Sequence, residues 1–124
     1  MKILDFVSGK VIKGKGFGSK LGFRTINLDL EFSEIEFGVY ACMVRVFDEC
    51  FFGVLHFGKS LTVGGGVGIE VHLFGFDGNL YGENVDVYVY NRIRDSLKFD
   101  SVEDLREAIV EDVVNVKNFF KYNL

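Results

Sequence analysis

The spacing of apolar residues changes once along this chain, near residue 100. Before that point apolar and polar residues mostly alternate, which is typical of β-strands with one buried face. After it, apolar residues recur every three or four positions, which is the spacing of one face of an α-helix. We therefore expect a mainly β domain that ends in a helix, and the 124 residues fit a single domain, 1–124.

Six runs before residue 100 have the composition of strands. The clearest is 85–90, where Val85, Val87 and Val89 alternate with Asp86, Tyr88 and Tyr90. The full set of expected strands is 5–12, 23–30, 39–47, 51–57, 69–74 and 85–90. The third and fourth are separated only by 48–50, a short polar connection suited to a hairpin. Strands separated by glycine turns predict a small antiparallel barrel, because closure removes exposed sheet edges.

One apolar stripe defines the predicted helix. Its members are Val102, Leu105, Ile109, Val113, Val116 and Phe120. Ser101 precedes the stripe as an N-cap, and Glu103 and Asp104 place negative charge where the helix dipole favours it. Valines are only middling helix formers, so packing against the strands must stabilise this helix.

Membrane and secreted classes do not fit the composition. No uninterrupted apolar run approaches the roughly 18 residues that a membrane helix needs. The start, MKILDFVSGK, lacks the apolar core of a signal peptide, so a cytoplasmic location is expected. Cys42 and Cys50 can either face each other across a hairpin or be two small buried hydrophobes, and a reducing compartment favours the second interpretation.

Charge is distributed unevenly. Residues 1–24 contain six basic side chains and one acidic one, a net +5, and the remainder sums to −9, giving the −4 of the whole chain. This balance argues against a general nucleic-acid binder. We also expect a monomer with small-molecule partners and no membrane partner. The basic segment either binds one compact anion or guards a strand edge with lysines.

Glycines cluster within that basic segment, at Gly14, Gly16, Gly18 and Gly22. A Walker A loop is excluded because Gly16 stands where Ser or Thr is needed, and a Rossmann fingerprint is excluded because Ser19 replaces its third glycine. Two interpretations remain. The segment is either a cationic loop whose backbone N–H groups approach phosphate oxygens, or a hairpin without function.

Two polar side chains interrupt the apolar pattern of 23–30. Thr25 and Asn27 are two residues apart and therefore share a strand face with Phe23. Neighbouring neutral oxygens suit Mg²⁺, which takes few protein oxygens together with phosphates and water. The alternative is an ordinary polar pair that faces solvent.

Glu70 lies between Ile69 and Val71 in a very apolar strand. Its carboxylate is either an exposed edge group or a partly desolvated base of the kind that catalysis uses. His72 shares its face. For His72, and equally for His56, a hydrogen-bonded core residue is the favoured interpretation over a ligand.

Taken in order, several segments resemble the riboflavin kinase (flavokinase) family, particularly the kinase module of bacterial bifunctional riboflavin kinase/FAD synthetases. The resemblance covers about residues 7–119. The matching stretches are SGKVIKGKGFGSKLGFRTINLDL, FGVYACMVRV, FFGVLHFGKSLT, IEVHLFGFDGNLYGENVDVYV and IRDSLKFDSVEDLREAIVEDV. It implies a six-stranded antiparallel Greek-key β-barrel with a C-terminal α-helix. It also implies transfer of the ATP γ-phosphate to the 5′-hydroxyl of riboflavin, giving FMN and ADP.

The same resemblance implies roles for individual residues. The family's PTAN motif falls on 24–27, so Thr25 and Asn27 would hold Mg²⁺ and the nucleotide phosphates, and Glu70 would be the catalytic carboxylate. Arg94 and Phe99, with the final helix, would border the flavin pocket. The glycine-rich loop before PTAN would cover the nucleotide phosphates with Gly14, Lys15, Gly16, Gly18, Lys20 and Gly22.

Two positions depart from the family pattern. The chain has no proline, and Arg24 and Leu61 replace prolines of the PTAN and GxxPT motifs. Since proline fixes φ near −65°, both changes can loosen the site. Arg24 either adds a phosphate contact or disturbs the metal. A barrel that binds flavin or FMN without catalysis is therefore the alternative hypothesis, followed by a general nucleotide-binding barrel. Fewer than about ten residues precede the match, so FAD synthesis is not expected from this chain.

Overall fold

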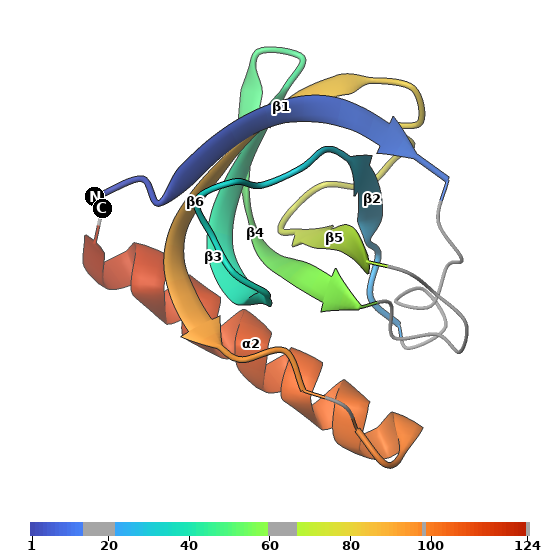
Figure 1. The fold of residues 1–124 in the computed structure, drawn as a ribbon, viewed down its shortest axis with the longest axis vertical. Coiled ribbons are helices and arrows are strands. Elements are labelled where there is room, and N and C mark those ends of the chain that lie inside the picture. The colour runs from blue at the N-terminus through green and yellow to red at the C-terminus, as the bar shows by residue number, and fades with distance from the viewer. Residues whose placement is uncertain (14–21, 60–66, 98, 124) are drawn as a thin grey trace.

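The structure is a computed structural model that describes residues 1–13, 22–59, 67–97 and 99–123. Within them, strands form a closed antiparallel barrel and one long helix follows (Figure 1). The strands are β1 Asp5–Ile12, β2 Ile26–Asp29, β3 Gly38–Val46, β4 Glu49–Lys59, β5 Val67–Leu73 and β6 Asn84–Arg94, and the helix is α2 Val102–Asn123. The predicted six-stranded barrel with a C-terminal helix is confirmed.

The strand order around the barrel is β1-β2-β5-β4-β3-β6. β3, β4 and β5 are consecutive antiparallel neighbours, and β6 returns to lie beside β3. Three adjacent strands and a fourth beside the first are the Greek key that the resemblance implies. The interior is filled by alternate residues of each strand, and Val85, Val87 and Val89 of β6 are fully buried there.

The predicted second strand is longer than the observed one. β2 begins at Ile26, not at residue 23, and pairs with β5 through Ile26↔Val71 and Leu28↔Ile69. Before β2, the backbone is bound to β5 by a side-chain hydrogen bond and not by strand pairing. The carbonyl oxygen of Arg24 lies 2.7 Å from Nδ1 of His72, which therefore carries the donated proton. The prediction of a strand from residue 23 is wrong because the alternation of apolar residues does not reveal this side-chain hydrogen bond.

The β3–β4 hairpin also differs from the prediction. Its two turn residues are Phe47 and Asp48, both with positive φ (53° and 60°), as in a type I′ turn. β4 therefore begins two residues earlier than the sequence pattern indicated. Cys50 is exposed and Cys42 is buried, and both are free thiols, so the expectation of two buried cysteines is wrong for Cys50.

α2 begins as predicted and continues to Asn123, beyond the predicted end at residue 120. Its cap is formed by Ser101, whose Oγ accepts a hydrogen bond from the backbone N–H of Asp104 at 3.1 Å. Val116 and Phe120 pack on the outer face of the barrel, where Phe120 stacks on Phe52 with ring centroids 4.0 Å apart. Val102, placed in the predicted stripe, is exposed.

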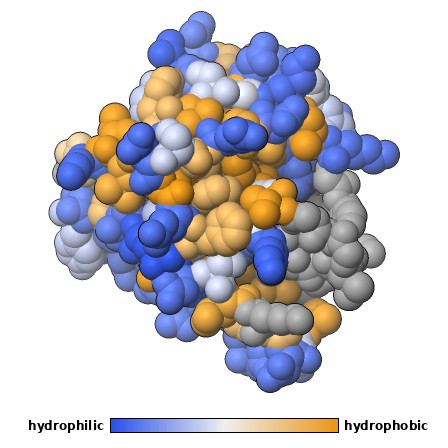
Figure 2. Space-filling model, in the orientation of Figure 1, coloured by the Kyte–Doolittle hydropathy of each residue, from blue (hydrophilic) through white to orange (hydrophobic). Residues whose placement is uncertain are grey.

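Figure 1 shows α2 running across one side of the barrel, so that the strands have an outer face that the helix covers. In the same orientation, apolar side chains gather in the middle of the molecule and hydrophilic ones surround them (Figure 2). Among the described residues no helix combines the length and apolarity of a membrane span.

Candidate functional site

A row of polar side chains crosses three neighbouring strands on the outer face of the barrel. Asn27 of β2 is paired with Glu70 of β5, and Glu70 is paired with His56 of β4. Residues directly opposite each other in an antiparallel pair place their side chains on the same face. Strand register therefore brings together groups that are far apart in the sequence.

A narrow pocket of about 60 Å³ lies between this face and α2. Four of the predicted site residues line it: Thr25, Glu70, Arg94 and Phe99. The remaining walls are Phe23, Val39, Val54, His56, His72, Leu97, Leu105, Ile109 and Asp112. Asn27 does not line this pocket, although it is the strand partner of Glu70. We call this the helix-side pocket.

Glu70 is the half-buried acid of the helix-side pocket. Burial raises its pKa, because removal from water disfavours the charged carboxylate. Such a carboxylate is a stronger proton acceptor than a fully solvated one. Of the two interpretations left open by the sequence, the partly desolvated group is the one observed.

The opposite wall is held by an ion pair that the sequence did not reveal. Arg94 binds Asp112 of α2 through two hydrogen bonds, Nε to Oδ1 and Nη2 to Oδ2, each 2.8 Å long. The Asp112 side chain is 5% exposed. The Arg94 guanidinium also lies 5.5 Å from the ring centroid of Phe99. These contacts fix α2 and Phe99 relative to the strands.

His56 is a hydrogen-bonded, half-buried residue, and its Nε2 lies 3.0 Å from Oγ of Ser96. Burial lowers its pKa, the positive charge of Arg94 lowers it further, and Asp112 acts in the opposite direction. His72 contacts Phe23 edge-on, with ring centroids 5.5 Å apart, besides its hydrogen bond to Arg24. Both histidines thus have partners, as expected, and both also line the helix-side pocket.

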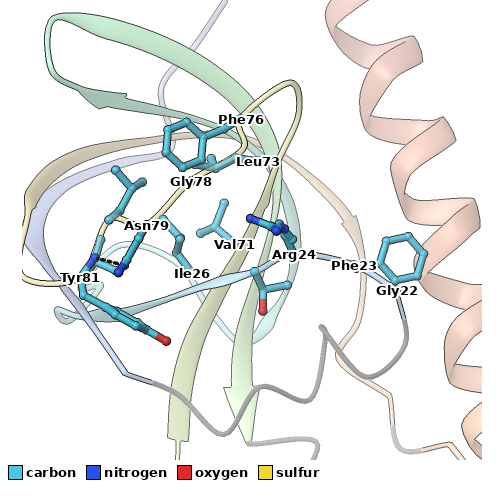
Figure 3. A pocket seen from close by; sticks show the side chains of 13 residues that line it. Gly22, Phe23, Arg24, Ile26, Val71, Leu73, Phe76, Gly78, Asn79 and Tyr81 are labelled. Atoms are coloured by element: carbon cyan, nitrogen blue, oxygen red, sulfur yellow. Dashed lines mark hydrogen bonds between the residues drawn. The ribbon is translucent and has the colours of Figure 1, made fainter.

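A second, larger pocket of about 480 Å³ lies on the other side of the segment that precedes β2. Its walls are Val11, Gly22, Phe23, Arg24, Thr25, Ile26, Val71, Leu73, Phe76, Gly78, Asn79, Leu80 and Tyr81. Figure 3 shows the Phe23 ring turned away from the other labelled side chains, on the side of α2. We call this the loop-side pocket, because residues 74–81 between β5 and β6 form one wall.

Phe23 and Thr25 line both pockets. The segment from Phe23 to Thr25 is therefore the partition between them. Thr25 thus borders both pockets, and of these two pockets only the helix-side one is lined by Glu70. Two molecules bound on the two sides would meet at this partition.

Arg24 faces the loop-side pocket and forms an ion pair with Asp77, Nη1 to Oδ1, at 2.5 Å. Asp77 belongs to the connection between β5 and β6. Both side chains are largely exposed, 69% for Arg24 and 85% for Asp77. At the family's proline position this chain therefore has a cation at a pocket wall.

Among the residues predicted in the glycine-rich loop, the structure describes Gly22. Gly14, Lys15, Gly16, Gly18 and Lys20 lie outside the described residues, as does Leu61. Gly22 is described: its φ of +88° is a left-handed conformation that favours glycine, and it lines the loop-side pocket.

The oxygens available for a metal are neutral. Within the described residues, no group of three or more His, Cys, Asp or Glu side chains is placed to hold an ion. Thr25 and Asn27 offer one hydroxyl and one amide oxygen beside the Glu70 strand. This donor set fits Mg²⁺ that is held mainly by substrate phosphates and water.

Comparison with known proteins identifies the family. Residues 5–120 match the flavokinase family, described as riboflavin kinase. The chain belongs to the riboflavin kinase family. The resemblance inferred from the sequence segments is thereby confirmed over nearly the whole chain.

Two relatives illustrate the match. The bifunctional riboflavin kinase/FMN adenylyltransferase of Haemophilus influenzae is 42% identical over 118 residues, covering 92% of this chain and 38% of that protein. The RNA-binding riboflavin kinase RibR of Bacillus subtilis is 34% identical over 120 residues, covering 95% of this chain and 52% of that protein. This chain thus spans about half, or less, of these relatives. Because the Bacillus subtilis relative is described as RNA-binding, the expected absence of a nucleic-acid partner stays a prediction for this chain.

Solved structures agree on the fold. A protein from Streptococcus pneumoniae described as a macrolide-efflux protein has a TM-score of 0.81 and 34% identity, covering 91% of this chain and 38% of that one. The riboflavin kinase of Trypanosoma brucei has a TM-score of 0.64 and 22% identity, covering 96% of this chain and 78% of that one. At 22% identity the second likeness shows the shared fold alone.

Sequence reasoning missed two acidic residues that pair with arginines lining these pockets. Asp112 lies on the buried face of the helix with the apolar stripe, but it was not predicted because its burial depends on pairing with Arg94 of a distant strand. Asp77 was missed because residues 75–78 carry only turn signals. The acidic residue within the helical stripe was a usable signal for the first, and no sequence pattern pointed to the second.

Proposed function

We propose that this domain transfers the γ-phosphate of ATP to the 5′-hydroxyl of riboflavin, giving FMN and ADP. The observation that carries the proposal is the pair of pockets that share Phe23 and Thr25, with Glu70 on one side only. Phosphoryl transfer needs a donor and an acceptor held together, and membership of the riboflavin kinase family agrees with that chemistry.

ATP is assigned to the loop-side pocket. Its volume of about 480 Å³ is within the roughly 300–1,000 Å³ typical of ligand sites. Its apolar side chains suit an adenine ring, and Thr25 and Gly22 lie at the edge that the phosphates would reach. The glycine-rich loop, whose N–H groups can approach phosphate oxygens, joins Gly22 directly in the chain.

Riboflavin is assigned to the helix-side pocket. At about 60 Å³ this pocket is smaller than typical sites for whole organic ligands, so it would take the hydroxyl end of the ribityl chain. Phe99 lines the same pocket, and its ring would offer an aromatic surface to the flavin ring. The Arg94 guanidinium, which lies over the Phe99 ring, lines the pocket as well.

Glu70 would accept the proton of the riboflavin 5′-hydroxyl while the hydroxyl oxygen forms a bond to the γ-phosphorus of ATP. The bond from that phosphorus to the β–γ bridging oxygen breaks, and ADP leaves with the electron pair. Thr25 at the partition and Asn27, the strand partner of Glu70, would hold Mg²⁺ on the phosphates, and the ion would supply positive charge for the phosphate oxygens. The partition then has one task, which is to keep the hydroxyl and the γ-phosphate in contact.

The test is the rate of FMN formation from riboflavin, ATP and Mg²⁺, followed by chromatography. Wild-type protein should form FMN, and Glu70→Gln should be slower by about 10²- to 10⁴-fold, the usual value of a general base. Glu49→Gln is the matched control, because Glu49 is exposed and lines neither pocket. Tight riboflavin binding with no FMN from either protein would refute the kinase proposal and support a binding barrel.

A further inference from the structure

The ion pair between Arg24 and Asp77 joins two walls of the loop-side pocket. Arg24 belongs to the partition before β2, and Asp77 lies between Phe76 and Gly78, which both line the pocket. Figure 3 shows the Arg24 side chain on the same side of the partition as Phe76 and Gly78. Arg24 therefore lines the pocket itself, and Asp77 is held beside the pocket wall by its two chain neighbours.

The backbone of Arg24 is fixed, and its charged end is not deeply buried. The His72 imidazole donates to the Arg24 carbonyl oxygen at 2.7 Å, which anchors the residue to β5. The Arg24 side chain is 69% exposed and that of Asp77 is 85% exposed. Exposed ion pairs contribute little to stability, so exchange of Asp77 for another anion costs little.

A phosphate is the anion that best fits this exchange. The planar guanidinium presents a fork of N–H donors that matches carboxylate and phosphate oxygens alike, and a phosphate carries more charge than Asp77. Thr25, the next residue, lines the pocket assigned to ATP. A nucleotide bound there would bring its phosphates to the neighbourhood of Arg24.

We propose that Arg24 binds a phosphate group of the nucleotide in the loop-side pocket, and that Asp77 is the counterion that it leaves. This inference rests on the proposed function, since it assumes that a nucleotide occupies that pocket. Arg24 is then a specificity-determining residue, which favours nucleotides over the nucleoside. Asp77 competes with the phosphate and weakens nucleotide binding.

Calorimetric titrations with ATP, ADP and adenosine test the proposal on the folded protein. Arg24→Gln should weaken ATP and ADP binding about tenfold, roughly the effect of one charge-assisted hydrogen bond, and leave adenosine unchanged. Arg24→Lys should lose less, because it keeps the charge and loses the fork. Asp77→Asn should tighten ATP and ADP binding about threefold in the wild-type background and not at all beside Arg24→Gln.

Arg45→Gln is the matched control, because Arg45 also pairs with an exposed aspartate, Asp48, and lines neither pocket. Unchanged ATP and ADP affinities in Arg24→Gln would overturn the inference, as would equal weakening of adenosine binding. An effect of Asp77→Asn that is the same in both backgrounds would also overturn it. If any of these three overturning results appears while wild-type protein still forms FMN, the inference fails and the proposed function stands. If wild-type protein binds no nucleotide, the proposed function fails with it.

Discussion

Two ion pairs in this molecule join similar residues and have opposite environments. Arg94 and Asp112 are 22% and 5% exposed, share two hydrogen bonds and connect β6 to α2. Arg24 and Asp77 are 69% and 85% exposed and connect the segment before β2 to the connection between β5 and β6. The buried pair is difficult to break, because either partner alone would be an uncompensated charge. The exposed pair exchanges partners easily. The buried pair therefore suits the positioning of α2, and the exposed pair suits the binding of an anion.

The largest expected effect comes from breaking the buried pair. Asp112→Ala should lower the free energy of unfolding by about 3–5 kcal/mol, measured by urea denaturation, because Arg94 remains buried without its partner. Asp77→Ala should change it by less than about 1 kcal/mol. Similar losses in the two variants would remove the distinction between the pairs. Replacing both partners, Arg94→Met with Asp112→Leu, should recover much of the loss.

A smaller, crossed effect should separate the two pockets. Phe99 lines only the helix-side pocket and Phe76 only the loop-side pocket. Phe99→Leu should raise the KM for riboflavin by up to about tenfold and leave that for ATP unchanged, and Phe76→Leu should do the reverse, since an aromatic contact contributes about 0.5–1.5 kcal/mol. Phe47→Leu, in the exposed turn, is the control. Loss of the crossed pattern would show that the pockets are assigned wrongly.

The smallest effect concerns the cost of keeping Glu70 in the helix-side pocket. Burial raises its pKa, so the folded protein binds a proton more tightly than the unfolded chain, and this contribution to stability falls as pH rises through the two pKa values. Glu70→Gln should therefore be more stable than wild type at neutral pH, and the gain should vanish below the pKa of an unfolded glutamate. Urea denaturation at both pH values measures it, and a gain that persists at low pH would contradict burial as the cause.

FMN formation should respond to pH in the opposite sense. Glu70 accepts a proton only when ionised, so the rate should fall as pH decreases through its raised pKa. A rate that stays constant through that range would argue against Glu70 as the base.

The fold was predictable because periodicity reports burial directly. Alternation in β6 and the three- and four-residue spacing in α2 each mark one buried face. The sequence also placed Thr25 and Asn27 on one face, but their position relative to Glu70 depends on strand order, which skips from β2 to β5. That non-local pairing has no signature in spacing.

The residues that sequence reasoning missed are those whose environment depends on a distant partner. Asp112 is buried because Arg94 crosses from β6 to α2, and Asp77 matters because the connection after β5 lies near the segment before β2. A cation at the proline position of the PTAN motif was visible in the sequence, and its carboxylate partner was not.

The central claim is that a phosphate passes from one pocket to the other across the partition of Phe23 and Thr25. The most direct measurement follows ATP labelled in its γ-phosphate, incubated with riboflavin, Mg²⁺ and the protein. We predict label in FMN in a one-to-one ratio with ADP, greatly slowed in Glu70→Gln. Release of the label only as inorganic phosphate would contradict this claim. So would formation of ADP without any FMN while riboflavin stays bound.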